Sequence, residues 1–96
     1  MTSAIGQLTM LKRAEDALSA DIDQEVVIMN QRDGKFYALD DIGRRVWEFI
    51  AEPRQVSEIC DFLLAEYEVD RATCETSLLK LIEKLSNAKL VEKVAA

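Results

Sequence analysis

The alternation of apolar and polar residues in the front half of the chain predicts three short β-strands. Apolar side chains alternate with polar ones over Ala17–Ile22, and a β-branched apolar run bounded by polar residues follows at Glu25–Asn30. An Asp33-Gly34 pair then precedes a third apolar run, Phe36–Leu39. Type I′ hairpin turns favour Asp-Gly because both central residues need positive φ. The pattern predicts an antiparallel meander whose second turn is of type I′.

Beyond Asp40 the apolar residues recur at the three- and four-residue spacing of helices, which predicts three of them. The first begins at Asp40 or Asp41 and ends before Pro53, because proline pushes its predecessor out of the α region. The second spans about Val56–Tyr67. The third is about sixteen residues long and is capped at its start by Asp70.

The whole chain, residues 1–96, is expected to form one domain, because chains split into domains only at greater length. Its fold class is α+β, with a three-stranded antiparallel sheet followed by three helices. Residues 1–16 form an N-terminal extension that is either partly disordered or contains a short strand, since only Leu8, Met10 and Lys12 alternate there. No signal peptide or stretch of about 18 apolar residues is present, so we expect a cytoplasmic protein that does not contact membranes.

The composition argues against catalysis. The chain contains no histidine, which is the usual general base and the commonest metal ligand. Its three glycines are isolated, so no phosphate-binding loop is present. The carboxylates occur at expected turns and helix starts, where acidic residues have structural roles. We therefore expect no enzyme activity, no cofactor and no metal.

The two cysteines, Cys60 and Cys74, form no metal or redox motif. Free cysteine is among the most buried residue types, so we interpret them as small core residues. A disulfide between them is the alternative, and a reducing compartment disfavours it.

The charge is uneven along the sequence. The net charge is −6, but residues 15–70 hold five basic and fifteen acidic residues, net −10, and each flanking segment is +2. Nucleic-acid binders normally carry a positive footprint, so this balance argues against DNA or RNA as a partner.

The expected sheet leaves an edge strand open. Phe36–Leu39 contains no Lys or Pro that would guard such an edge. An extended peptide can add to it as a fourth strand. Alternatively, the N-terminus or the third helix of the chain covers the edge.

Gly43 lies near the start of the first helix, where glycine is unfavourable. Its presence there predicts that another part of the chain packs closely against that backbone.

A set of short motifs resembles the PqqD-like family. The matching residues are Ser19 to Met29, Gly34 to Asp40, Gly43, Val46-Trp47, Pro53, Val56, Glu58-Ile59-Cys60, Leu63-Leu64, Tyr67, Val69-Asp70, Cys74 and Leu78 to Leu90. They cover most of the chain, from about Ser19 to Val91. The Asp-Ile-Asp opening, the Tyr-x-Leu-Asp strand end and both cysteines are more narrowly similar to the stand-alone PqqD-like chaperones of lasso peptide biosynthesis.

The resemblance implies a winged helix-turn-helix domain that recognises the leader segment of a ribosomally made precursor peptide. The leader would add beside the third strand, in a groove against the third helix, and a transglutaminase-like leader peptidase would receive the bound precursor. A cyclase is a further candidate partner. The implied peptide-binding residues are Val27, Met29, Phe36, Tyr37, Ala38, Leu39, Leu78, Leu79 and Ile82. Val27 and Met29 would form the floor of the groove if their face of the sheet points to it.

The sequence departs from the family pattern at two places. Ala38 stands where the family often has Gly, and Asn87-Ala88-Lys89 replaces a Gly-containing end of the third helix. Three other functions stay open at this stage: a carrier for pyrroloquinoline quinone maturation, a winged-helix DNA-binding regulator and a module that self-associates through the open edge. The oligomeric state is not determined by the sequence.

Overall fold

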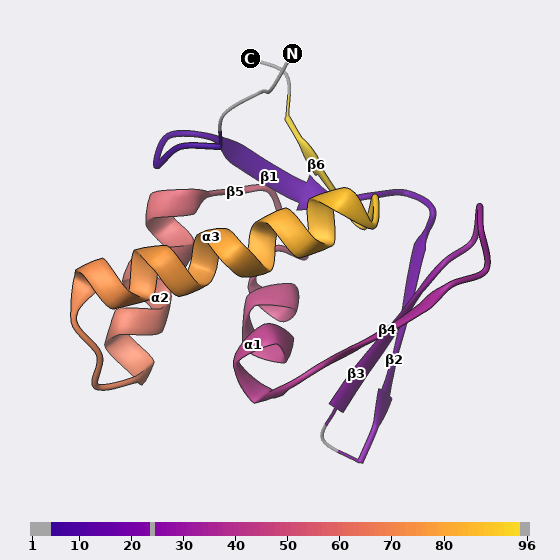
Figure 1. The fold of residues 1–96 in the computed structure, drawn as a ribbon, viewed down its shortest axis with the longest axis horizontal. Coiled ribbons are helices and arrows are strands. Elements are labelled where there is room, and N and C mark those ends of the chain that lie inside the picture. Colours follow the sequence, from indigo (N-terminus) through magenta and orange to yellow (C-terminus); the bar gives the residue numbers. More distant parts are fainter. Residues whose placement is uncertain (1–4, 24, 95–96) are drawn as a thin grey trace.

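Figure 1 shows the computed structural model, which describes residues 5–23 and 25–94. The elements are β1 (Met10–Arg13), β2 (Ala17–Ile22), β3 (Glu25–Asn30), β4 (Phe36–Leu39), α1 (Asp41–Phe49), β5 (Arg54–Gln55), α2 (Val56–Glu66), α3 (Arg71–Asn87) and β6 (Val91–Lys93). The predicted α+β class, the meander and the three helices are confirmed.

The strands form two separate antiparallel sheets. The expected meander is the sheet β2-β3-β4, with β3 in the centre and β4 at one edge. A second sheet, in the order β5-β1-β6, joins the start, middle and end of the chain. It includes a strand within the first sixteen residues. Strand β5 has only two residues, so it is too short to show the alternation by which a strand is predicted from the sequence.

The hairpin between β3 and β4 forms as expected, but its turn is not of type I′. Gly34 has a positive φ of 71°, whereas Asp33 is not among the residues with positive φ. Instead the Asp33 side chain accepts a hydrogen bond from the Lys35 amide at 2.9 Å. The Gly34 amide donates to the Asn30 carbonyl at 2.8 Å. A longer loop therefore closes the hairpin with a single left-handed residue.

The core lies between the three helices and the inner face of the β2-β3-β4 sheet (Figure 1). Its fully buried members include Val26, Ile28, Val46, Trp47, Ile50, Ile59, Leu78, Ile82, Leu85 and Leu90. The close packing expected at Gly43 is confirmed, because a Cβ there would lie 3.1 Å from the Cβ of Leu39. Among the described residues, none of the helices is long and apolar enough to cross a membrane.

Asp70 caps the N-terminus of α3, as the sequence predicted: its side chain accepts hydrogen bonds from the amide and the hydroxyl of Thr73. At the other end, Lys89 adopts a left-handed φ of 61°, where glycine is usual. The Leu90 amide then donates to the Leu85 carbonyl at 2.9 Å and ends the helix. Lys89 thus takes a conformation that glycine adopts more readily.

Asn30, at the end of β3, fastens the sheet to the end of α3. Its side chain is 2% exposed, and its Nδ2 donates to the Ala88 carbonyl at 2.9 Å. Its Oδ1 accepts from the Arg32 amide at 2.8 Å. This one buried side chain therefore satisfies the helix end and holds the first residues of the hairpin loop.

We expect Asn30→Ala to lower the free energy of unfolding by about 1–3 kcal/mol, because it leaves the Ala88 carbonyl without its partner. Chemical denaturation monitored by circular dichroism measures this change. The exposed neighbour serves as the control: Gln31→Ala should shift stability by no more than about 0.5 kcal/mol. Equal effects of the two substitutions would contradict the role of the Asn30 side chain.

Candidate peptide-binding site

Strand β4 presents backbone groups to the outside of the sheet. The Asn30 amide donates to the Lys35 carbonyl, and hydrogen-bonded pairs alternate along an antiparallel ladder. Tyr37 and Leu39 therefore pair with β3, whereas Phe36 and Ala38 direct their N–H and C=O groups away from it. Within the described residues no strand pairs with this edge of β4. The strand formed by the described N-terminal residues, β1, pairs with β5 and β6 and not with β4.

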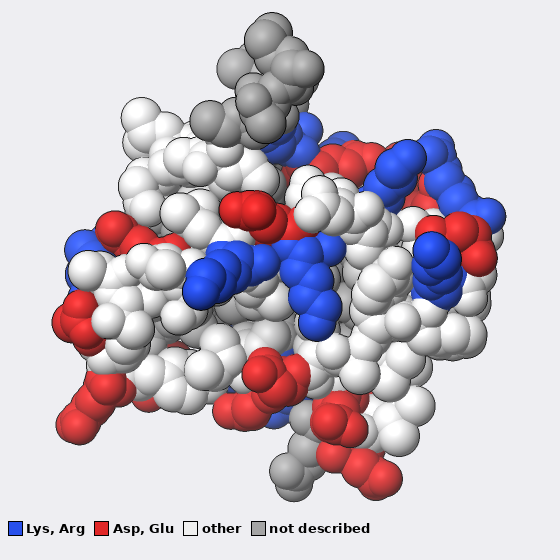
Figure 2. Space-filling view, in the orientation of Figure 1, with Lys and Arg blue, Asp and Glu red and all other residues white. Residues whose placement is uncertain are grey.

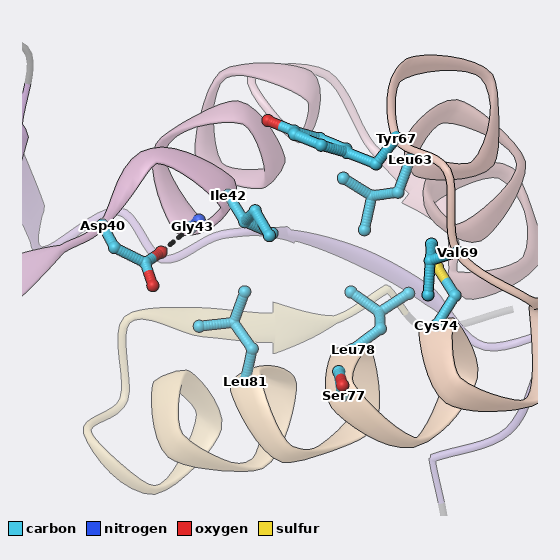
Figure 3. A pocket seen from close by; sticks show the side chains of 10 residues that line it. All are labelled: Asp40, Ile42, Gly43, Leu63, Tyr67, Val69, Cys74, Ser77, Leu78 and Leu81. Carbon is cyan, nitrogen blue, oxygen red and sulfur yellow. Dashed lines mark hydrogen bonds between the residues drawn. The ribbon is translucent and has the colours of Figure 1, made fainter.

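A pocket of about 290 Å³ opens where β4 ends and α1 begins (Figure 3). Its lining comes from the start of α1, the end of α2 and the outer part of α3. The lining residues are Asp40, Ile42, Gly43, Leu63, Tyr67, Val69, Cys74, Ser77, Leu78 and Leu81. Leu78 and Leu81 rise from α3 towards Ile42 and Leu63, so the interior is mainly apolar. Such a pocket accepts an apolar side chain.

Hydrogen bonds fix the walls of this pocket. The Asp40 carboxylate accepts from the Gly43 amide at 2.8 Å and thereby caps α1 at the pocket mouth. The Tyr67 hydroxyl donates to Asp41 at 3.1 Å and links the end of α2 to the start of α1. Desolvation and this hydrogen bond raise the pKa of Tyr67, so the phenol keeps its proton and remains a donor. The pocket is therefore present before any ligand binds.

The edge and the pocket are continuous along one flank of α3. Ser77 and Leu81 line the pocket on this flank, and Lys84 and Ala88 follow at helical spacing. The carbonyl of Ala88 contacts Asn30 of the sheet. One end of the flank contacts β3 through Ala88, and the other end lines the pocket together with Asp40, the residue that follows β4. A chain added to β4 would therefore run alongside this flank of α3.

The structure places the nine expected peptide-binding residues differently from one another. Phe36, Tyr37, Ala38 and Leu39 form the open strand, and Leu78 lines the pocket. The other four, Val27, Met29, Leu79 and Ile82, line no part of it.

The helical phase explains the departures on α3. Ile82 is only 1% exposed and belongs to the core. Each residue turns a helix by about 100°, so Leu79 lies about 200° from Leu81, on the opposite flank. Leu81 therefore takes the position that the sequence assigned to Leu79. The helical spacing of Cys74, Leu78, Leu81, Ile82 and Leu85 already placed Leu81 on the apolar stripe of the helix and left Leu79 outside it. The expected binding set named Leu79 because it followed the family resemblance and not this spacing.

The pleat explains the departures on β3. Val27 pairs with Ala38 and Met29 pairs with Phe36, and residues opposite each other share a face. The residues that alternate with them, Val26, Ile28 and Leu39, point into the core. The two pairs Val27–Ala38 and Met29–Phe36 therefore point outwards. Val27 and Met29 consequently lie on the outer face of the sheet and do not form the floor of the groove.

The outer face of the sheet is itself apolar. It carries Leu18, Ala20 and Ile22 from β2, Val27 and Met29 from β3, and Phe36 and Ala38 from β4, with the acidic Glu25 of β3 at one end, opposite Ile22. Leu18, Ile22 and Phe36 are 52%, 54% and 68% exposed. A contiguous group of exposed large apolar side chains marks a surface for another protein.

The chain is similar to a known protein family and to two solved structures. The family model of coenzyme PQQ synthesis protein D (PqqD) matches residues 25–91. One similar solved structure is TbiB1 in complex with the TbiA(beta) leader peptide, which is 38% identical with a TM-score of 0.81, over 88% of this chain and 99% of that one. A lasso peptide synthetase B1 complexed with its leader peptide shares the fold, at 21% identity and a TM-score of 0.77, over 85% and 96% of the two chains. No curated protein matches the chain.

The two cysteines meet behind the pocket. Cys60 of α2 and Cys74 of α3 are both buried and free, with Sγ atoms 3.5 Å apart, whereas a disulfide needs about 2.05 Å. Desolvation, followed by the hydrogen bond to Cys74, raises the pKa of Cys60 to about 11. The expectation of two small core residues is confirmed in this reduced form.

We expect both thiols to resist alkylation in the folded protein. Since the pKa of Cys60 is about 11, its thiolate fraction at mildly alkaline pH is about a hundredfold below that of an unperturbed cysteine. Iodoacetamide labelling followed by mass spectrometry should therefore be at least this much slower without urea than with it. Rapid modification of either cysteine in the folded protein would contradict the buried thiol pair.

Proposed function

The chain belongs to the PqqD family, and on that premise we propose that it is a non-catalytic protein that binds the leader segment of a ribosomally made lasso peptide precursor. The observation that carries this proposal is the open β4 edge leading into an apolar pocket. The TbiB1 structure, which contains a leader peptide and covers most of this chain, supports it. Because the precursor is made on ribosomes, we place the protein in the cytoplasm.

Binding proceeds by addition of a strand. The outward N–H and C=O groups of Phe36 and Ala38 pair with the leader backbone, which supplies affinity without reading sequence. Side chains on one side of the added strand point towards α3, where an apolar one enters the pocket beside Leu78 and Leu81. The pocket therefore supplies the selectivity. This step forms and breaks no covalent bond, so it requires neither a histidine nor a metal.

The affinity of this arrangement is moderate. Ordering a disordered leader offsets much of the gross contact energy. Burial of one large apolar side chain contributes about 1.5–3 kcal/mol, and the backbone pairs contribute modestly. We therefore expect dissociation constants in the submicromolar to micromolar range.

We further propose that the outer face of the β2-β3-β4 sheet docks the leader peptidase, which is transglutaminase-like. This face carries the exposed Leu18, Ile22 and Phe36. It lies on the reverse side of the strand that pairs with the leader, so a protein bound there would stand directly beside the bound precursor. Recognition of the leader then uses the edge of the sheet, and delivery to the peptidase uses its outer face. The cyclase can act on the same presented precursor.

Ala38→Pro tests the added strand. Proline removes the outward N–H at position 38 but no hydrogen bond between β3 and β4, and edge strands tolerate it. We expect the affinity for a fluorescently labelled TbiA(beta) leader peptide, measured by anisotropy, to fall about tenfold or more. Ser19→Pro is the matched control, because Ser19 of β2 presents its amide at the opposite edge of the sheet.

The two proline variants make the site falsifiable. Circular dichroism first establishes that both retain the native fold. If Ser19→Pro weakened peptide binding and Ala38→Pro did not, the peptide would add to β2 instead of β4, which would contradict the proposed site. If neither variant changed the affinity for the peptide, strand addition would be excluded.

Leu18→Asp tests the docking of the peptidase. The substitution places a charge in the apolar outer face, far from the β4 edge, and should leave leader binding unchanged. The assay uses a transglutaminase-like peptidase encoded next to this protein. With this protein at limiting concentration, cleavage of the precursor should be about tenfold or more slower for the variant than for the wild type. Ser19→Asp, one residue along and on the opposite face, should support normal cleavage. Equal cleavage rates with both variants would contradict the outer face as the docking surface. Sedimentation of the protein without peptidase shows whether this face instead joins two copies of the chain.

A further inference from the structure

Two exposed lysines of α3, Lys80 and Lys84, stand beside the site. Figure 2 shows basic side chains gathered over α3 in the middle of this face, with one acidic group directly above them and further acidic groups along the lower border. Neither lysine forms an ion pair with any of the described residues. We refer to these two residues as the lysine ridge.

Lys84 lies on the flank of α3 that faces the sheet. It follows the pocket residue Leu81 by three positions, which is just under one turn and about 4.5 Å along the helix axis. It precedes Ala88, whose carbonyl contacts Asn30 of β3. Lys84 is therefore located between the pocket and the point where α3 meets the sheet, above the path of a chain added to β4. Lys80 is its neighbour one turn earlier.

The ridge has no evident role in the stability of the protein. Like charges four residues apart on a helix repel each other and are mildly destabilising. The helix dipole favours a cation in the last turn, which applies to Lys84 but not to Lys80. Moreover, the chain as a whole is acidic, with a net charge of −6, yet neither lysine uses the available carboxylates. A charge that remains unpaired beside a binding groove is available to a ligand.

From this placement we propose that the bound peptide carries an Asp or Glu two positions from its apolar anchor, facing the lysine ridge. This inference rests on the proposed strand addition. Side chains that share one face of an extended strand are two residues, or about 6.6 Å, apart. The first such position beyond the pocket, in the direction of the hairpin, lies below Lys84, and the flexible lysine stem spans the remaining distance. The spacing of anchor and acid holds for either direction of the added strand.

The chemistry of the ridge distinguishes this ligand from DNA. Helix α3 adds only Arg71 to the ridge, and Arg71 already pairs with Asp61 and Glu75. The acidic Asp40 and Asp41 stand near the other end of the groove. A duplex would bring its phosphates against these carboxylates, whereas a single acidic side chain at the ridge avoids them. An acidic peptide therefore fits the charge pattern better.

The test selects ligands from random sequences, so the precursor need not be identified first. A displayed library of random peptides is sorted on the immobilised wild-type protein and on a Lys80→Glu/Lys84→Glu variant. We expect wild-type selections to share a large apolar residue with Asp or Glu two positions away, and the variant to exchange that acid for Lys or Arg. A selected acidic peptide should bind the variant about tenfold more weakly in solution, and high salt should remove most of this difference.

Two control variants separate this inference from the proposed function. Lys93→Glu changes an exposed lysine of β6, in the other sheet, and should select the same peptides as the wild type. Leu81→Ser, compared with Leu79→Ser, should abolish selection for the apolar anchor. If the wild type selects no anchored peptides, the proposed function fails.

The remaining outcomes concern the ridge itself. Anchored peptides without the acid, or an unchanged preference in the charge-reversed variant, would overturn the ridge proposal alone. Duplex DNA is titrated against the wild type and the Lys80→Glu/Lys84→Glu variant in parallel. If the wild type bound DNA, the variant did not, and the peptide preference were the same for both, the ridge proposal would also be overturned.

Discussion

The hydrogen bond between Asn30 and the Ala88 carbonyl is the contact on which the geometry of the binding site depends. It joins the end of the central strand to the end of α3, and it is buried, so its loss would leave a desolvated carbonyl unpaired. At the other end of β4, the Asp40 side chain caps α1 and fixes the start of that helix at the pocket. The first contact ties the end of α3 to the sheet and the second sets one wall of the pocket, so together they position the pocket next to the open edge.

The β2-β3-β4 sheet serves two purposes through the ordinary pleat of its strands. Alternate residues of β3 point inward to the core and outward to solvent. The inward set, with Val26 and Ile28, supports α1 and α3, while the outward set provides an apolar face that the described chain leaves uncovered. The backbone of β4 adds a third surface, perpendicular to both. A sheet of only three strands thus has a core face, an exposed apolar face and an open edge for a peptide.

Electrostatics adds direction to an otherwise apolar groove. The pocket mouth carries Asp40, whereas the flank of α3 beyond Leu81 carries Lys84. With the proposed lysine ridge, we expect peptides that match the apolar pocket but carry a positive charge along this flank to bind less well, so that selectivity arises from repulsion as well as attraction. The net charge of −6 conceals this local arrangement, since the acidic residues concentrate between positions 15 and 70.

The sequence by itself determined the secondary structure of the sheet and helices. Strand bounds followed from alternation, and helix starts followed from Asp40 and Asp70, because both signals are local and depend on neighbours within a few residues. It also determined that β4 carries no guarding residue. The tertiary structure alone decided which side of each element faces the ligand. The helical spacing placed Leu81 on the apolar stripe of α3, but only the tertiary structure showed that the start of α1 and the end of α2 leave part of this stripe open as a pocket. Likewise Val27 and Val26 differ only by one step of the pleat, and the side occupied by the helices decides which of them is core. The facing of a side chain depends on contacts between residues far apart in the sequence, and a local pattern does not contain them.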